Sequence, residues 1–157
     1  QNQEDYRPDV ILRLQPTNPT FPLDQIDRGI ELLLENPEAD SLRPVTPSPK
    51  HPYKMWKTTD GGPWIEPLFE KSITGLDEPF NMGRQQFPPV FVQVGAMEIL
   101  IYETLMQKKS MAGKKILSLV IEDPFLTINI DTELDFLLAE LALKRAAADK
   151  KNKDPLS

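Results

Sequence analysis

The chain has 157 residues, and its 18 basic and 24 acidic residues give a formal net charge of −6 at pH 7. This length is enough for one compact domain with a sizeable core. The basic residues are scattered along the chain, which argues against nucleic acid as a partner. Cysteine is absent, so disulfides and cysteine-ligated metals are excluded.

The sequence also argues against a membrane partner. No apolar run approaches the roughly 20 residues that a membrane-spanning helix needs, and no signal-peptide pattern opens the chain. We therefore expect a soluble, cytoplasmic protein. The first residue is Gln1 rather than methionine, which is compatible with a processed, trimmed or partial product.

The first predicted elements are a strand, a helix and a second strand. Residues 10–14 form a nearly continuous apolar run between two prolines, which predicts a buried strand. In residues 23–35 the apolar positions recur at intervals of three and four, which predicts an amphipathic helix. The helix should end before Pro37, and a second strand is expected over residues 41–45.

Residues 44–89 hold much of the chain's proline and show no sustained apolar period. Sixteen prolines in 157 residues is about twice the usual fraction of roughly 5%. Long irregular segments inside a compact domain are usually functional arms or lids, so we expect an inserted arm here. Within it, residues 53–58 and 64–68 flank an Asp-Gly-Gly turn and predict a β-hairpin.

The remaining elements again alternate between strands and helices. Strands are predicted over residues 90–94, 97–101 and 116–121, with a short helix beginning near Tyr102. A long final helix follows residue 132; its leucines at helical spacing should face a core, and residues 149–157 should form a disordered polar tail. This order predicts one α/β domain, residues 1–148, with a mainly parallel sheet.

A polar junction stands out between residue 128 and the last helix. Residues 128–131 read as the end of a strand, on which Asn129 and Asp131 point to the same side. Paired oxygens at a strand end can hold a hard cation such as Mg²⁺. The alternative is that Asp131 or Thr132 only caps the helix, because Thr132 and Asp135 have capping-box spacing. Both roles can coexist.

Four stretches in order carry a resemblance to a known family: Leu14-Gln15-Pro16-Thr17-Asn18-Pro19, His51-Pro52-Tyr53-Lys54-Met55-Trp56, Pro88-Pro89-Val90-Phe91-Val92-Gln93-Val94-Gly95-Ala96 and Ile130-Asp131-Thr132-Glu133-Leu134-Asp135-Phe136. Together they resemble the acylneuraminate cytidylyltransferases, the CMP-sialic acid synthetases, from about Tyr6 to Lys144. The resemblance implies an α/β, three-layer, nucleotide-diphospho-sugar-transferase-like (Rossmann-like) fold. That fold would be incomplete at its amino end and would carry a proline-rich β-hairpin arm for homodimer contacts.

The resemblance further implies the partners and the chemistry. The partners would be CTP and a 2-keto-3-deoxy sugar acid, whose anomeric hydroxyl attacks the α-phosphorus of CTP and releases pyrophosphate with help from Mg²⁺. Asp131 would be a catalytic metal ligand and Asn129 its neighbouring ligand. Arg84 would be catalytic, and it and Lys54 would pair with the carboxylate or the phosphates. The implied substrate-binding residues are Gln15, Thr17, Lys54 and Gln93.

The sequence also departs from the family pattern. Asn129 stands where an aspartate is usual, Phe21 where a basic residue is usual, and Val94 where an asparagine is usual. The family's CTP-binding glycine-rich loop precedes everything seen here, so we expect the chain alone not to bind CTP productively. A longer enzyme, a second polypeptide and lost catalysis are the open explanations. A non-catalytic sugar-acid-binding or interaction protein is therefore the second hypothesis; a metal-dependent hydrolase has no clustered carboxylates in its favour.

Several residues have simpler interpretations. The only histidine, His51, is typical of a structural or surface residue rather than a catalytic base. Trp56 and Trp64 are expected to pack the hairpin or a subunit contact, with stacking on a base or sugar as the alternative. For Arg84, a solvated surface position remains an alternative to ligand binding. Lys114 and Lys115 are expected in an exposed loop.

Overall fold

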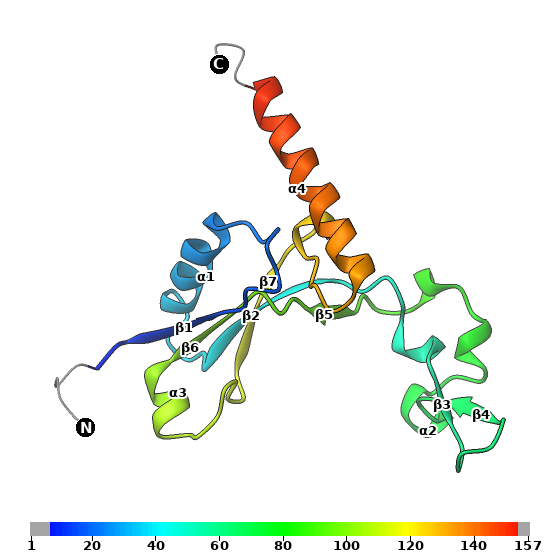
Figure 1. Cartoon of the computed structure of the whole chain (residues 1–157). Coiled ribbons are helices and arrows are strands. Elements are labelled where there is room, and N and C mark those ends of the chain that lie inside the picture. The colour runs from blue at the N-terminus through cyan, green and yellow to red at the C-terminus, as the bar shows by residue number, and fades with distance from the viewer. Residues whose placement is uncertain (1–6, 154–157) are drawn as a thin grey trace. The chain divides into compact units, whose positions relative to one another are not determined.

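The computed structural model describes residues 7–153, with side chains through Asp149. The chain divides into two compact units (Figure 1). Unit 1 joins the residues up to Thr46 to those from Gln93 onward, and unit 2 consists of Pro47–Val92. Within residues 7–153, no helix combines the length and the apolar character needed to cross a bilayer.

The larger sheet and the helices around it account for most of the regular structure. The elements are β1 (Val10–Leu14), α1 (Asp24–Leu34), β2 (Ser41–Pro47), β5 (Phe91–Gln93), β6 (Met97–Ile101), α3 (Tyr102–Met106), β7 (Ile116–Val120), the 3₁₀ turn η4 (Pro124–Leu126) and α4 (Glu133–Lys153). The predicted strands 10–14 and 97–101 are confirmed with the bounds expected from sequence. The predicted helix over 23–35 is confirmed as α1, one residue shorter at each end.

The sheet is mixed and mostly antiparallel, so the predicted mainly parallel, Rossmann-like sheet is wrong. Its order is β1-β6-β2-β5, with β7 paired to β2. Strand β6 runs antiparallel to both β1 and β2, whereas β7 runs parallel to β2. The prediction failed because alternating strands and helices suggest parallel neighbours, but β1 and β2 are not neighbours. Strand β6 lies between them and runs in the opposite direction.

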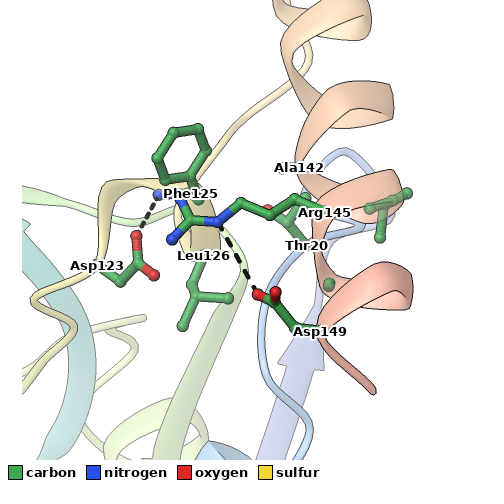
Figure 2. Close-up of a pocket in the computed structure, with 9 residues that line it drawn as sticks. Thr20, Asp123, Phe125, Leu126, Ala142, Arg145 and Asp149 are labelled. Carbon is green, nitrogen blue, oxygen red and sulfur yellow. Dashed lines mark hydrogen bonds and ion pairs between the residues drawn. The ribbon is translucent and has the colours of Figure 1, made fainter. Parts of the chain in front are cut away.

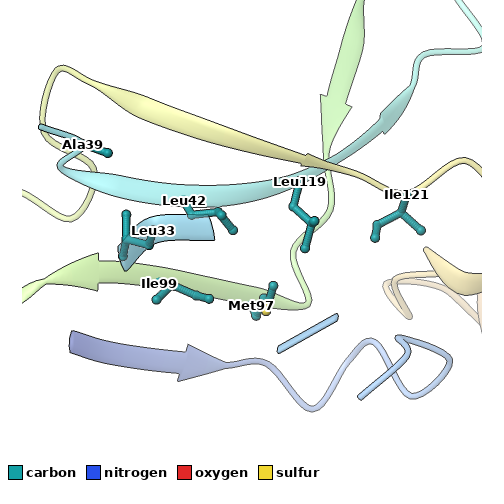
Figure 3. Close-up of a cluster of buried hydrophobic side chains, with 7 residues drawn as sticks. All are labelled: Leu33, Ala39, Leu42, Met97, Ile99, Leu119 and Ile121. Carbon is teal, nitrogen blue, oxygen red and sulfur yellow. The ribbon is translucent and has the colours of Figure 1, made fainter. Parts of the chain in front are cut away.

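The core lies between α1 and the sheet (Figure 3). Its buried members are Leu33, Ala39, Leu42, Met97, Ile99, Leu119 and Ile121. Helix α1 comes very close to β6, because a Cβ built on Gly29 would lie 2.7 Å from Ile99 Cδ1 and 3.0 Å from Met97 Cε. A glycine at this position lets the helix seat its apolar stripe directly on the sheet.

Two predictions about strands are corrected. Strand β1 was expected to be buried, but it is the end strand of the sheet, and Leu14 is 53% exposed. Residues 128–131 were expected to be a strand, but they form no strand. Ile130 N–H donates to the carbonyl of Thr17 at 2.8 Å. That bond fixes the segment in place without building a ladder.

Helix α4 differs from its prediction in length and in the face that it buries. It continues to Lys153, so residues 149–153 of the expected tail are helical; residues 154–157 lie outside the described part. The stripe expected to face the core is exposed: Leu134, Leu137, Leu138 and Leu141. Ala139 and Ala142 are buried instead. Periodicity finds an apolar stripe, but it does not say which stripe another element covers.

Unit 2 contains the predicted hairpin. Its strands are β3 (Trp56–Thr58) and β4 (Ile65–Pro67), which pair antiparallel. Short helical segments surround them: η1 (Pro52–Lys54), α2 (Lys71–Thr74), η2 (Pro79–Asn81) and η3 (Arg84–Gln86). His51 is buried, with its ring centroid 4.7 Å from those of both Tyr53 and Phe87, and its Nδ1 accepts from Tyr53 N–H at 3.2 Å. Of the two expected placements of His51, structural or surface, the structure shows a buried ring packed among aromatic side chains.

Candidate functional site

Three segments that are far apart in the sequence meet in unit 1. They are residues 15–18 after β1, residues 95–96 before β6, and residues 129–131 before α4. Gln15 N–H donates to the carbonyl of Ala96 at 2.9 Å, and Ile130 N–H donates to that of Thr17 at 2.8 Å. These backbone bonds bring side chains from three of the four family-like stretches to one place.

A chain of side-chain hydrogen bonds connects two of these segments. Asn18 Nδ2 donates to Asn129 Oδ1 at 2.8 Å, and Asn129 Nδ2 donates to Asp131 Oδ2. Asn18 is buried, Asn129 is partly buried and Asp131 is exposed. The chain therefore runs from the interior to the surface and ends on a carboxylate. We name Asn18, Asn129 and Asp131 the amide relay.

Gly95 contributes backbone to the same place. A Cβ built on Gly95 would lie 3.7 Å from Asn18 Nδ2 and 3.9 Å from Gln15 Nε2, so both side chains flank its backbone. Gln15 and Thr17 are only partly buried. The structure thus gathers a partly accessible group of carboxamides, one hydroxyl and one carboxylate. Such groups can bind the hydroxyls and the carboxylate of a polar ligand.

The cap of α4 lies beside this site and confirms the predicted capping box. Asp135 Oδ2 accepts from the Thr132 hydroxyl at 2.7 Å, from Thr132 N–H at 2.8 Å and from Asp131 N–H at 3.2 Å. Asp135 N–H donates back to Thr132 Oγ1 at 3.3 Å. The hydrogen bond from the Thr132 hydroxyl, followed by those from the backbone, lowers the pKa of Asp135. Thr132 and Asp135 therefore make the cap, and the Asp131 carboxylate lies outside it.

The donor atoms near Asp131 decide whether Mg²⁺ fits. Mg²⁺ prefers oxygen ligands and is commonly held by one or two carboxylates together with substrate phosphates. Asp131 supplies one exposed carboxylate, but Asn129 Oδ1 accepts from Asn18 and its nitrogen faces Asp131. Among the side chains described, those of residues 7–149, no group of three or more acidic or histidine side chains could hold a metal. The residues fit a cation that also binds phosphate, with Asp131 rather than Asn129 as the protein ligand.

Lys54, Arg84 and Gln93 take no part in the hydrogen bonds that join the three segments. Lys54 and Arg84 belong to unit 2, where Lys54 Nζ donates to the carbonyl of Phe80 at 3.1 Å and Arg84 Nη1 to that of Pro49 at 2.8 Å. Arg84 also lines a cavity of about 250 Å³ in that unit. Gln93 is exposed at the end of β5. Of the predicted residues, the structure brings together Gln15, Thr17, Asn129 and Asp131.

A separate pocket of about 170 Å³ lies in unit 1 between η4 and α4 (Figure 2). The Arg145 guanidinium lies 4.7 Å from the centroid of the Phe125 ring, and its Nε lies 4.0 Å from Asp149 Oδ2. Asp123 accepts from Phe125 N–H at 2.9 Å. Of these contacts, the one between Arg145 and Phe125 joins α4 to η4, and the other two lie within one element each. The pocket contains none of the predicted site residues.

Sequence reasoning missed Asn18 as a member of the site. It appeared only within the first family-like stretch and was given no role, because its partner Asn129 is 111 residues away. A carboxamide shortly after the end of a strand and directly before Pro19 was the available signal.

No protein-family model matches the chain, and no curated protein matches it.

Proposed function

We propose that this chain belongs to a cytidylyltransferase that couples CTP to a nonulosonic sugar acid, yielding a CMP-sugar and pyrophosphate. One observation carries the proposal. Three of the four stretches that resemble this family, around Gln15, Gly95 and Asp131, meet in one region of unit 1. The resemblance was drawn from sequence order alone. The pairing of β1 with β6 places Gln15 beside Gly95, and the bond from Ile130 N–H to the Thr17 carbonyl adds the segment with Asp131.

The side chains suit the two substrates in distinct ways. Gln15 and Thr17 offer donors and acceptors for the hydroxyls and the carboxylate of the sugar acid. Asp131 would hold Mg²⁺, which, when bound, neutralises charge on the triphosphate. We assign Lys54 and Arg84 to the anionic groups of the substrates and Gln93 to a polar contact with the sugar acid. As the resemblance implies, we propose a cytoplasmic homodimer.

A second candidate is a sugar-acid-binding protein without catalysis, or one subunit of a split enzyme. It is favoured by Asn129, a neutral amide whose oxygen accepts from Asn18, so that the relay presents one carboxylate, that of Asp131. A single carboxylate should hold Mg²⁺ more weakly than two. The sugar-acid contacts of Gln15 and Thr17 would be unaffected.

Pyrophosphate release from CTP tests the proposal. The protein encoded by the complete reading frame is assayed with Mg²⁺ and a panel of nonulosonic acids, alongside calorimetric binding of each acid. We expect turnover, with a loss of about 100-fold or more in Asp131→Ala, since removing a charge-stabilising group costs on that order. The control Asp149→Ala removes an exposed acid of α4 outside the site and should retain activity.

The outcomes separate the candidates. Binding of a sugar acid without turnover would favour the non-catalytic candidate. Neither binding nor turnover would contradict both.

A further inference from the structure

We propose that Asn18 is a positioning residue which, through Asn129, fixes the orientation of the Asp131 carboxylate. The inference rests on the proposed function and deepens it, because Asp131 is the residue proposed there to hold Mg²⁺. It is drawn from the amide relay itself, whose members come from two segments 111 residues apart.

The chemistry of the three groups sets the direction of the relay. An ionised carboxylate only accepts hydrogen bonds, so the atom of Asn129 that faces Asp131 has to be its nitrogen. The oxygen of Asn129 therefore faces Asn18, which in turn has to present its own nitrogen. This is the arrangement found, with Asn18 Nδ2 at 2.8 Å from Asn129 Oδ1. Without the Asn18 donor, the Asn129 carboxamide would be held by its bond to Asp131 alone, and its oxygen would lose its partner.

Burial makes Asn18 the anchor of the relay. Its side chain is only 6% exposed and lies beside Gly95, and the adjacent Thr17 carbonyl is bonded to Ile130 N–H. Asn18 Oδ1 is buried and accepts no hydrogen bond from residues 7–149. A buried acceptor without a donor costs stability. If Asn18 only filled this volume, an apolar side chain of similar size would fill it without that cost. The donor is the part of Asn18 that the site uses.

A fixed carboxylate matters because groups that orient a ligating residue commonly change metal affinity by 10–100-fold. Asp131 is exposed and outside the cap of α4, so Asn129 is the side chain that restrains it. The relay therefore supplies one carboxylate, that of Asp131, in a fixed orientation. The family pattern would supply two, because an aspartate is usual at position 129.

A double-mutant cycle tests the inference without CTP or sugar acid. The proteins are Asn18→Ala, Asn129→Ala and the double variant. Asn36→Ala is the matched control, because Asn36 is another part-buried asparagine of unit 1, whose Nδ2 donates to the carbonyl of Leu32 at 2.8 Å. The first readout is the ¹⁵N–¹H resonances of the Asn129 side-chain amide in metal-free protein. The second is affinity for Mn²⁺ alone, from paramagnetic relaxation.

We expect Asn18→Ala to shift the Asn129 amide resonances and to speed their exchange with water, while Asn36→Ala leaves both unchanged. Mn²⁺ affinity should fall about 10-fold in each single variant and no further in the double variant, because Asn18 acts through Asn129. Unchanged Asn129 resonances in Asn18→Ala, or losses that multiply in the double variant, would overturn the inference.

Two further provisions keep the test decisive. If Asn18→Ala fails to fold, Asn18→Asp replaces it, since this variant keeps the volume but cannot donate to Asn129 Oδ1; Asn129 resonances identical to wild type would then overturn the inference. If Mn²⁺ binds the wild type too weakly to measure, the amide resonances decide. Because neither readout involves turnover, an inactive protein would contradict the proposed function and leave the relay standing.

Discussion

Asp40 is the buried acid that holds the loop between α3 and β7. It accepts from Lys108 Nζ, from Lys114 N–H at 2.6 Å and from Lys115 N–H at 3.0 Å. The Lys108 hydrogen bond, followed by the two backbone bonds, holds the pKa of this carboxyl well below its ordinary value of 3.8. Gly113 has φ of +73°, and a Cβ there would come within 2.2 Å of Asp40 Cβ. The loop can therefore close over Asp40 only with glycine at this position.

Asp40→Asn should lower the thermal unfolding midpoint at pH 7. The Asp40 carboxyl takes up its proton at a lower pH in the folded state than in the unfolded state. The stability contributed by the Asp40 carboxylate is therefore fully present above about pH 4. It is lost progressively as the pH falls below that value. The difference in midpoint between wild type and variant should therefore narrow as the pH falls from about 4 toward 2.

The control for this prediction is Asp77→Asn, because Asp77 is an exposed acid paired with Lys71 at 2.8 Å. It should change the midpoint little at any pH, since exposed ion pairs contribute little. A difference for Asp40→Asn that stays constant with pH would contradict the assigned role.

At the scale of single residues, sequence reasoning identified local contacts and missed distant ones. The Thr132 and Asp135 cap was predicted because both residues lie within one turn. The Asp40 anchor was missed, and Lys114 and Lys115 were expected only to be exposed, because these contacts span more than 70 residues. Asn18 escaped notice for the same reason. No spacing rule relates residues that only the tertiary fold brings together.

At the scale of elements, Thr132 starts α4 next to the candidate site. Thr132→Ala should destabilise the protein by about 1 kcal/mol, because it removes the hydroxyl that accepts from Asp135 N–H and donates to Asp135 Oδ2. Urea unfolding measures this change. Thr127→Ala is the control, since that hydroxyl bonds to the Pro124 carbonyl in η4 and not to the cap. Equal losses in both variants would argue against the capping role.

Apolar periodicity predicted most helices and strands. It failed where a neighbouring element decides whether a strand forms or which face of a helix is buried. Strands β1 and β6 and helix α1 match their apolar patterns closely. Residues 128–131 alternate between apolar and polar residues like a strand, yet they form none. A half-buried strand needs this alternation, but it also needs a neighbouring strand to pair with. The leucine stripe of α4 failed similarly, since the helix buries Ala139 and Ala142 instead.

At the scale of the whole molecule, the alternation of strands and helices predicted an α/β chain but not the sheet order. Strand β6 lies between β1 and β2 and reverses the direction of both pairings. The candidate site was predicted in part: Gln15, Thr17, Asn129 and Asp131 come together in unit 1, whereas Lys54 and Arg84 belong to unit 2. The geometry of unit 1 alone therefore carries the argument for a sugar-acid site.

Chemical-shift mapping with a nonulosonic acid tests that site most directly. The acid is titrated into ¹⁵N-labelled protein without CTP or metal. We predict that the shift changes concentrate on the backbone amides of Gln15, Thr17, Asn18, Gly95 and Asn129. Changes confined to other regions, such as the pocket around Phe125 and Arg145, or no changes at saturating acid, would contradict the account.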